Sequence, residues 1–350
     1  MSKKSKMCLE EFTSLTDKHL NLLTELGVAN ISSLAALNVN ELKVMLDTTL
    51  NRATLILKEA RENLPPFEIT SAKMILESDK TRSYLSTNCP ALDQLLGGRG
   101  LESGSITEVF AQYGTGKSQI AFSAIVSALL KDKSGVSGSV IVIDTEGTTS
   151  PDRLLEILKF YSHMYEGAPE DLLENIVVVR PKDTSEQIAI VKLFLEGEGM
   201  GYMKYTNVKN PLRLVVVDSL TGLFRSEFLG RGTLNQRQQK LNEHLRDLYM
   251  FGLKNSVPIL VTNQVISSPD PFVYGQIAVG GNIVAHASTY RISLQKRKNY
   301  RIAKMVDSSR LPSNEVVFKL SKRGVIGVDE TDFTAEEYQA YLSTEVQGKN

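Results

Sequence analysis

The sequence is short of several features that would point to whole classes of protein. It has only two cysteines among 350 residues, Cys8 and Cys89, which lie far apart and form no CxxC pair. The four histidines show no metal-ligand spacing, so neither a disulfide framework nor a zinc site is predicted. No apolar run approaches the ~18 residues of a membrane span, and the lysine-rich N-terminus lacks the apolar segment of a secretory signal. We therefore expect a soluble intracellular protein with no membrane partner.

An excess of charge of either sign is also missing. Forty basic residues balance forty acidic ones, which excludes the global basic field of a protein that coats DNA regardless of its sequence. Any contact with nucleic acid must come from local loops or from a surface built by assembly. The length predicts two domains, or one large domain with a small appendage.

The hydrophobic pattern changes along the chain. Residues 1–63 are predicted to form a small all-α domain behind a polar tail, because their leucines recur at helical spacing. Pro65-Pro66 marks a linker over 64–84. Over 85–330, Val/Ile runs alternate with helical segments, which predicts an α/β fold with a mostly parallel sheet covered by helices on both faces. Residues 331–350 are expected to be a C-terminal tail. Strands are expected at 106–110, 139–144, 175–179, 212–218 and 257–262, and antiparallel edge strands near 290–295, 301–306 and 315–320.

A glycine-rich segment follows the strand expected at 106–110. Gly114 and Gly116 let the backbone turn so that its N–H groups converge on phosphate, Lys117 adds a positive charge, and the Ser118 hydroxyl can bind Mg²⁺. The helix expected next favours an anion at its N-terminus. Ala111 takes the place of the usual first glycine, which alanine can do if its φ is negative. We therefore predict a nucleotide site at Ala111, Gln112, Tyr113, Gly114, Thr115, Gly116, Lys117, Ser118 and Gln119.

Two carboxylates follow other strands of the expected sheet. Asp218 ends the strand at 212–218, where a Mg²⁺ carboxylate belongs, although it could instead cap the next helix. Glu146 lies just beyond the strand at 139–144 and could orient or deprotonate an attacking water, although it could also be a turn residue before Gly147.

Further segments carry a resemblance to a family. The chain resembles the RecA-type strand-exchange proteins, archaeal RadA and its eukaryotic counterparts, over about residues 85–325. The matching stretches begin at Ile143-Asp144-Thr145-Glu146-Gly147-Thr148 and Val217-Asp218-Ser219-Leu220-Thr221, and continue through Gly230-Arg231-Gly232-Thr233-Leu234, Arg237-Gln238-Gln239-Lys240-Leu241, Thr262-Asn263-Gln264-Val265 and Gly280-Gly281-Asn282-Ile283-Val284-Ala285-His286. This resemblance implies a RecA-like P-loop ATPase core preceded by a helix-hairpin-helix-like domain.

The resemblance also implies roles for the nucleotide site. Glu146 would be the catalytic carboxylate, beside Lys117 on the phosphates, and Gln264 would sense the γ-phosphate, although a Gln at a strand end could also bond only to backbone. Ser118 and Asp218 would hold the metal, with ATP and Mg²⁺ as the cofactors. Arg153 would stack on adenine. Asp307 and Pro312 would cap the nucleotide of the neighbouring subunit.

The implied partners are single-stranded and double-stranded DNA and further copies of the chain in a helical filament or ring. One DNA loop would carry Arg225, Phe228 and Arg231, and a second, over about 266–281, would end at Gly280 and Gly281, with His286 close behind. In the linker, Phe67 or Ile69 would anchor the neighbour, followed by Ala72. A basic run, Lys296 to Arg301, could hold phosphates or be a solvated hairpin.

The implied function is that of an ATP-dependent recombinase that pairs and exchanges DNA strands in recombinational repair, in the cytoplasm or nucleoid if archaeal and the nucleus if eukaryotic. Two departures favour an alternative, a recombinase paralogue or mediator that binds ATP but exchanges few strands. The second hairpin of the N-terminal domain, at Asp47-Thr48-Thr49, lacks the glycine that lets backbone amides approach phosphate, so duplex binding and a protein-contact role remain equally open. In the linker, Ile69 stands where the family has an aromatic anchor. Thr149-Ser150 also replaces the family's Phe-Arg, a change that the sequence alone does not explain. Paralogues or mediators would then be further partners.

Overall fold

The computed structural model describes residues 9–26, 28, 31–63, 71–132, 135–196, 210–228, 230–267 and 276–328. The chain divides into two compact units, residues 1–81 and 82–350. The polar N-terminal tail, Pro65-Pro66 and the tail expected at 331–350 lie outside the described residues.

The first unit is helical, as its leucine pattern predicts. Buried side chains such as Leu23, Leu34, Leu42 and Ile56 form its core. Polar residues begin the helices, because a side-chain oxygen accepts a hydrogen bond from an N–H group of the first turn; Asn38 does so in a full capping box with Glu41. The elements are the 3₁₀ turn η1 (Leu9–Glu11) and helices α1 (Asp17–Glu25), α2 (Ile31–Ala36), α3 (Val39–Met45) and α4 (Leu50–Glu62), followed by α5 (Ala72–Lys80) within the expected linker.

The second unit is built on a nine-stranded sheet in the order β13-β12-β11-β10-β3-β7-β6-β4-β5. Its central strands are parallel and consist almost wholly of buried β-branched and apolar residues, as expected for a sheet covered on both faces. Strands β10, β11 and β12 pair antiparallel, as predicted. A further strand, β13, pairs with β12 in the same way and was not predicted. The bounds are β3 (Ile106–Phe110), β4 (Ser139–Asp144), β5 (Ile176–Val179), β6 (Leu212–Asp218), β7 (Ile259–Asn263), β10 (Tyr290–Arg297), β11 (Tyr300–Ser308), β12 (Glu315–Ser321) and β13 (Gly324–Gly327).

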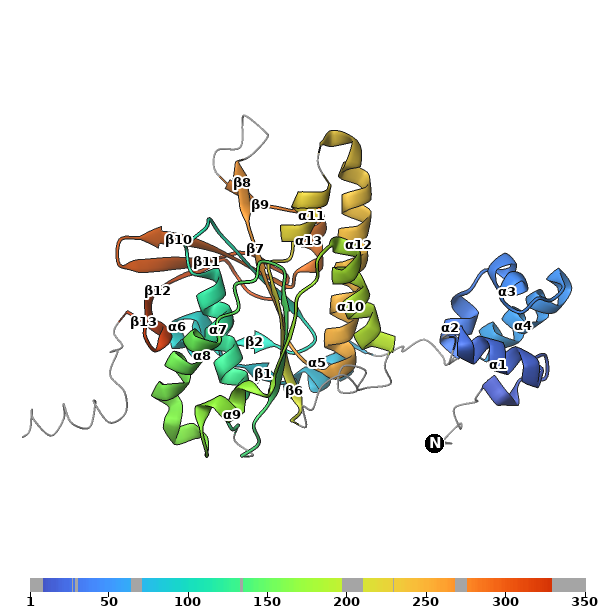
Figure 1. Cartoon of the computed structure of the whole chain (residues 1–350), viewed down its shortest axis with the longest axis horizontal. Coiled ribbons are helices and arrows are strands. Elements are labelled where there is room, and N and C mark those ends of the chain that lie inside the picture. The colour runs from blue at the N-terminus through green and yellow to red at the C-terminus, as the bar shows by residue number, and fades with distance from the viewer. Residues whose placement is uncertain are drawn as a thin grey trace, which may run out of the picture. The chain divides into compact units, whose positions relative to one another are not determined.

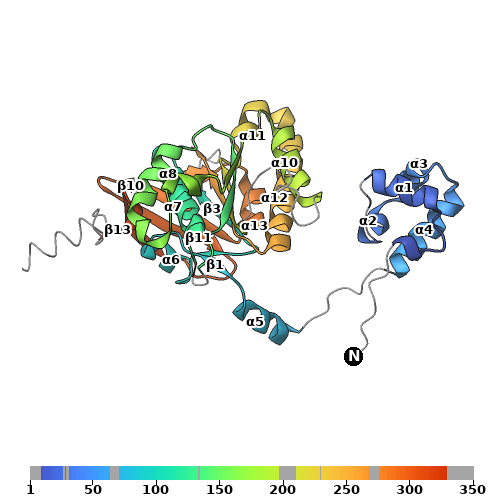
Figure 2. The same cartoon turned by 60° about the horizontal axis from the view of Figure 1, so that its bottom comes forward.

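Helices cover both faces of this sheet (Figure 1). On one face α6 (Pro90–Leu95), α7 (Lys117–Leu129) and α8 (Pro151–Leu158) enclose one apolar core. On the other, α10 (Thr184–Glu196) and α12 (Leu234–Asn255) enclose a second, and Figure 2 shows the two helix layers on opposite sides. The remaining elements are η2 (Lys159–Met164), α9 (Pro169–Leu173), α11 (Gly222–Glu227), η4 (Arg231–Thr233) and α13 (Gly281–Ala287).

Parallel pairing brings the carboxyl ends of four strands to one edge. Phe110 at the end of β3 lies opposite Asn263 at the end of β7, and Asp144 of β4 lies opposite Asp218 of β6. Loops that leave this edge are therefore neighbours although they are far apart in sequence.

Two further short pairings, apart from that of β13 with β12, were also not predicted from the sequence. Strands β1 (Tyr84–Leu85) and β2 (Leu101–Glu102) pair antiparallel, and β8 (Val265–Ser267) pairs with β9 (Gln276–Ala278) at the base of the second expected DNA loop. Among the described helices, none is long and apolar enough to span a bilayer.

Candidate active site

The glycine-rich segment forms a tight loop between β3 and α7. Gly114 and Gly116 adopt positive φ values of 69° and 118°, and Gly116 is the residue that starts α7. A Cβ atom on Gly116 would come within 3.2 Å of Leu320 Cδ1, so the site favours glycine sterically as well. Lys117 Nζ donates to the carbonyl oxygens of Ala111 and Gln112, each over 3.2 Å. The loop thus points a cation and a helix N-terminus toward the space that an anion would fill.

Ala111 fits the position of the missing glycine. It is buried, it is not among the described residues with positive φ, and its N–H donates to the Asn263 carbonyl oxygen over 3.2 Å. The expectation that alanine suits a negative φ here is confirmed. At the tip of the loop, Tyr113 is fully exposed, while Thr115 Oγ1 donates to the Gln112 carbonyl oxygen over 2.9 Å.

The two residues predicted to hold the metal lie together. The Ser118 hydroxyl donates a hydrogen bond to the Asp218 carboxylate, which also accepts from Thr262 and, over 3.3 Å, from Thr148. Asp218 does not cap a helix through its side chain. Burial raises its pKa, the Glu146 charge adds to that rise, and the hydroxyl bonds oppose it. An aliphatic hydroxyl beside a carboxylate is an all-oxygen donor pair of the kind Mg²⁺ prefers.

Glu146 and Gln264 also meet at this edge of the sheet. Gln264 Nε2 donates to Glu146 Oε1 over 2.7 Å, and Gln264 Oε1 accepts a hydrogen bond from the Arg225 guanidinium. Lys117 lies near enough for Glu146 and Asp218 to raise its pKa, although burial has the larger effect and lowers it. Lys117, Glu146, Gln264 and Arg225, the arginine of the first expected DNA loop, thus form one polar cluster.

Asp144 is a residue of the site that was not singled out from the sequence. It is buried at the end of β4 and accepts hydrogen bonds from the N–H groups of Thr148 (3.0 Å) and Thr149 (3.2 Å) and from Arg180 Nε (3.3 Å). Burial alone would raise its pKa, but these bonds outweigh burial and lower it. Asp144 therefore fixes the turn that carries Glu146; a carboxylate directly after a buried strand was the available signal.

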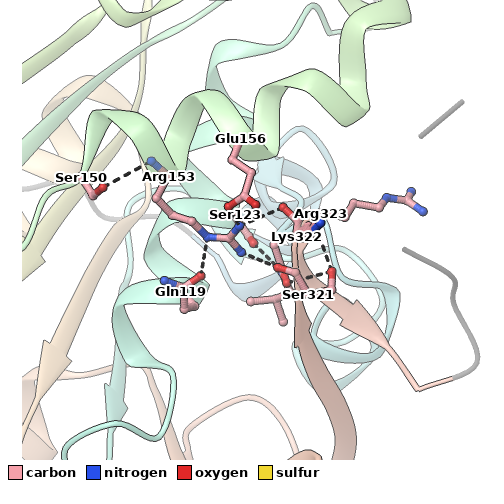
Figure 3. A network of polar contacts seen from close by, with 10 residues as sticks. Gln119, Ser123, Ser150, Arg153, Glu156, Ser321, Lys322 and Arg323 are labelled. Atoms are coloured by element: carbon pink, nitrogen blue, oxygen red, sulfur yellow. Dashed lines mark hydrogen bonds and ion pairs between the residues drawn. The ribbon is translucent and has the colours of Figure 1, made fainter. Parts of the chain in front are cut away.

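Arg153 lies on α8 in a network of polar contacts with α7 and the turn after β12 (Figure 3). Its Nε donates to Gln119 Oε1 over 3.0 Å, its Nη1 donates to the Lys322 carbonyl oxygen over 2.9 Å, and it also binds the Ser321 carbonyl and Glu156. Ser150 Oγ accepts from the Arg153 N–H over 3.3 Å and so caps α8. This gives a structural reason for serine in place of the family's arginine at this position.

The predicted DNA-contacting residues are not all gathered. Arg225 is exposed on α11, and the half-buried ring of Phe228 packs on the second core with Lys240 Nζ 5.3 Å from its centre. Gly280 has a φ of 96° and Gly281 of 58°, at the start of α13. His286 instead lines a cavity of about 720 Å³ together with Asp307. The side chain of Arg231 lies outside the described residues.

Of the predicted cap and polymerisation residues, the structure describes Asp307, Pro312 and Ala72. Asp307 and Pro312 are exposed, and neither takes part in the Arg153 network. Ala72 is the first residue of α5. Phe67 and Ile69 lie outside the described residues. Within the described part of the chain, no group of three or more His, Cys, Asp or Glu side chains forms a metal cluster.

A glycine-rich loop between β3 and α7, with carboxylates at the ends of parallel strands of the same sheet, is the arrangement of a RecA-like α/β core. The Rad51 family profile matches residues 80–328. The chain belongs to this family. It is 36% identical over 332 residues to the DNA repair and recombination protein RadA of Metallosphaera sedula, covering 94% of this chain and 98% of that protein. It is 42% identical over 267 residues to the protein of the same name from Cenarchaeum symbiosum, covering 75% of this chain and 63% of that one.

Proposed function

We propose that the chain is an ATP-dependent DNA recombinase of recombinational repair, which assembles as a filament on single-stranded DNA and promotes homologous pairing and strand exchange. The observation that carries this proposal is the continuous cluster from Lys117 through Glu146 and Gln264 to Arg225. It joins groups suited to ATP hydrolysis to a cation on a loop suited to a DNA strand.

The hydrolytic part of the proposal follows from the chemistry of these side chains. Lys117 and the N–H groups of the loop would hold the β- and γ-phosphates, and Arg153 would support the adenine. Glu146 would accept a proton from, or orient, the attacking water. Gln264 can donate to a phosphate oxygen and accept from water with the same amide, so a γ-phosphate would compete with Glu146 for it.

The residues present fit a magnesium ion. Ser118 and Asp218 already lie within hydrogen-bonding reach of each other beside the phosphate loop. A bound Mg²⁺ would supply charge neutralisation on the phosphates. Asp218 must be ionised to contribute to this site, and its raised pKa makes it easier to protonate than an exposed aspartate.

The DNA-contacting part rests on loop chemistry. A guanidinium such as that of Arg225 can bind phosphate, and N–H groups at Gly280 and Gly281 can do the same where no side chain intervenes. Assembly would bring the Asp307–Pro312 segment of one subunit over the nucleotide of the next, with Phe67 or Ile69 and Ala72 joining the subunits. Nucleotide and filament would then be coupled.

One observation favours the regulatory alternative, a paralogue or mediator. Asp47 occupies the left-handed position of the second N-terminal hairpin with a φ of 45°. A carboxylate there repels phosphate, whereas glycine would leave the amides open. This argues against duplex binding by that hairpin. It does not bear on ATP hydrolysis in the second unit.

The proposal is tested with the full chain and with Glu146→Gln, which keeps the shape of the side chain. We expect the wild type to hydrolyse ATP faster with oligo(dT) and to exchange strands. Glu146→Gln should bind a fluorescent ATP analogue but hydrolyse about 10²- to 10⁴-fold more slowly. Glu174→Gln, on an exposed residue, is the matched control. A wild type that binds ATP yet shows neither activity supports the regulatory alternative instead.

A further inference from the structure

Asn263, the last residue of β7, is fully buried and uses every hydrogen-bonding position of its side chain. Its Nδ2 donates to Glu108 Oε1 and to the Val279 carbonyl oxygen, each over 2.7 Å. Its Oδ1 accepts from Thr221 Oγ1 over 2.7 Å and from the Gln264 N–H over 2.9 Å. A primary amide has two donors and two acceptor lone pairs, so none is left over.

The partners of Asn263 come from different functional segments. Thr221 directly precedes α11 and the first DNA loop, and Val279 directly follows β9, where the second DNA loop returns to the core. Glu108 lies in β3, which leads into the phosphate loop. The Asn263 carbonyl oxygen itself accepts from the N–H of Ala111, the first residue of that loop. Asn263 therefore contacts the points where all three loops join the core.

These bonds are costly to lose. Glu108 is fully buried, and its second oxygen accepts from Arg291 Nε over 2.6 Å, while the Asn263 amide satisfies the first. Removing one partner would leave a buried polar group without a hydrogen bond. The structure can avoid this cost only if one of the loops shifts where it joins the core. The arrangement thus fixes the positions at which the three loops join the core relative to one another.

We infer that Asn263 is a positioning residue for DNA-dependent ATP hydrolysis. Asn263 touches neither nucleotide nor DNA. It aligns the points where the two DNA loops join the core with the phosphate loop, so that a DNA strand bound at these loops acts on Gln264 and Glu146. This inference rests on the proposed function, since it requires that DNA stimulates hydrolysis.

The test uses Thr221, which can lose its bond to Asn263 with almost no change of shape. Thr221→Val removes the hydroxyl, and Thr221→Ser retains it. ATP hydrolysis is measured with and without oligo(dT), and binding of a fluorescent ATP analogue is measured in parallel. We expect Thr221→Val to bind the analogue and to hydrolyse without DNA within about twofold of wild type, and to lose about five- to tenfold of the DNA stimulation. Thr221→Ser should restore the stimulation.

Two further variants separate positioning from loss of stability. Thr87→Val removes another buried hydroxyl, which donates to Asp93 Oδ1 over 2.7 Å away from these loops; it should lower the thermal midpoint and leave the stimulation ratio unchanged. Asn263→Asp places a carboxylate against Glu108 and should lower both the thermal midpoint and the DNA stimulation ratio. If Asn263→Asp does not fold, the DNA stimulation ratios of Thr221→Val and Thr221→Ser decide whether the inference holds.

The failures are distinguishable. A stimulated wild type together with a normal ratio in Thr221→Val overturns the role of Asn263 and leaves the proposed function intact. A wild type without DNA stimulation overturns both. An equal loss of stimulation in Thr87→Val would also overturn the inference, because stability alone would then explain the effect.

Discussion

Gln264 Nε2 donates a hydrogen bond to Glu146 Oε1 over 2.7 Å, so the proposed sensor holds the proposed catalytic carboxylate directly. The same amide accepts from Arg225 on its other side. This bridge joins β7, the turn after β4 and the first DNA loop, and a change at any of them reaches the other two through one side chain.

Gln264→Met removes both hydrogen bonds at nearly constant length. We expect the variant to bind ATP normally and to lose at least about tenfold of its DNA-stimulated rate, because Arg225 is no longer linked to Glu146. Gln264→Glu should also slow basal hydrolysis, since two carboxylates at this distance cannot both ionise easily. Steady-state ATPase assays with and without oligo(dT) measure this, with Gln236→Met on the exposed side of α12 as control. Full DNA stimulation in Gln264→Met would rule out the bridge.

Arg153→Lys tests the support of the adenine. Lysine cannot reach Gln119, Glu156 and the turn at Ser321 together, because it lacks the forked guanidinium. The KM for ATP in the absence of DNA should rise about tenfold while kcat stays within about twofold, since the group is remote from Glu146. Arg246→Lys, on an exposed arginine of α12, should leave KM unchanged. A fall in kcat alone would contradict this role.

His244 predicts an acid-sensitive core. It is fully buried on α12, its Nε2 lies 3.1 Å from Gln187 Nε2, and burial lowers its pKa to about 3. In the unfolded chain the imidazole takes up a proton near pH 6.5, whereas in the native state it stays neutral down to about pH 3. The free energy of unfolding is therefore highest above pH 6.5 and falls as the pH drops toward 3. From pH 7 to pH 5 the loss attributable to this residue is about 2 kcal/mol.

Urea unfolding at pH 7 and pH 5 measures this loss. His244→Leu should reduce the difference in unfolding free energy between the two pH values by about 2 kcal/mol, whatever it does to stability at pH 7. His163→Leu, on an exposed histidine, should not change the difference. An unaltered pH dependence in His244→Leu would mean that the ring takes up its proton over the same pH range in the native state as in the unfolded chain.

Asp47→Gly tests the N-terminal hairpin. A left-handed φ of 45° strains a residue with a Cβ atom, so glycine should stabilise this unit by roughly 1 kcal/mol. It also removes a negative charge, and duplex DNA affinity at low salt should rise severalfold. Asp47→Asn removes the charge but keeps the Cβ atom, and separates the two effects. Unchanged duplex binding in both variants would assign the hairpin to another role.

Much of the fold was predictable because its signals are local. The strands at 106–110, 139–144 and 212–218 were predicted to the residue, since each is short and rich in β-branched residues, as strands are. The pairing of β8 with β9 was missed, because three-residue strands at a loop base carry no periodicity.

The candidate site was predictable in its parts more than in its connections. Lys117, Ser118, Glu146 and Asp218 each follow a strand or a glycine turn, which are sequence-local signals. The surroundings of Phe228 and His286 were not predicted: the first packs on the core and the second lines a cavity with Asp307, while their contacts with DNA stay predictions. Which neighbours a side chain meets depends on elements that are distant in the chain.

The sequence by itself determined the phosphate loop, the alternation of strands and helices, and the family resemblance, because backbone propensity, apolar burial and motif spacing are all encoded over short stretches. Only the tertiary structure decided that Gln264 holds Glu146, that Asp144 fixes the turn carrying it, and that Asn263 contacts three loop bases. The physical reason is the parallel sheet, whose register brings residues of different strands, such as Asn263 and Glu108 at a separation of 155 residues, within hydrogen-bonding distance.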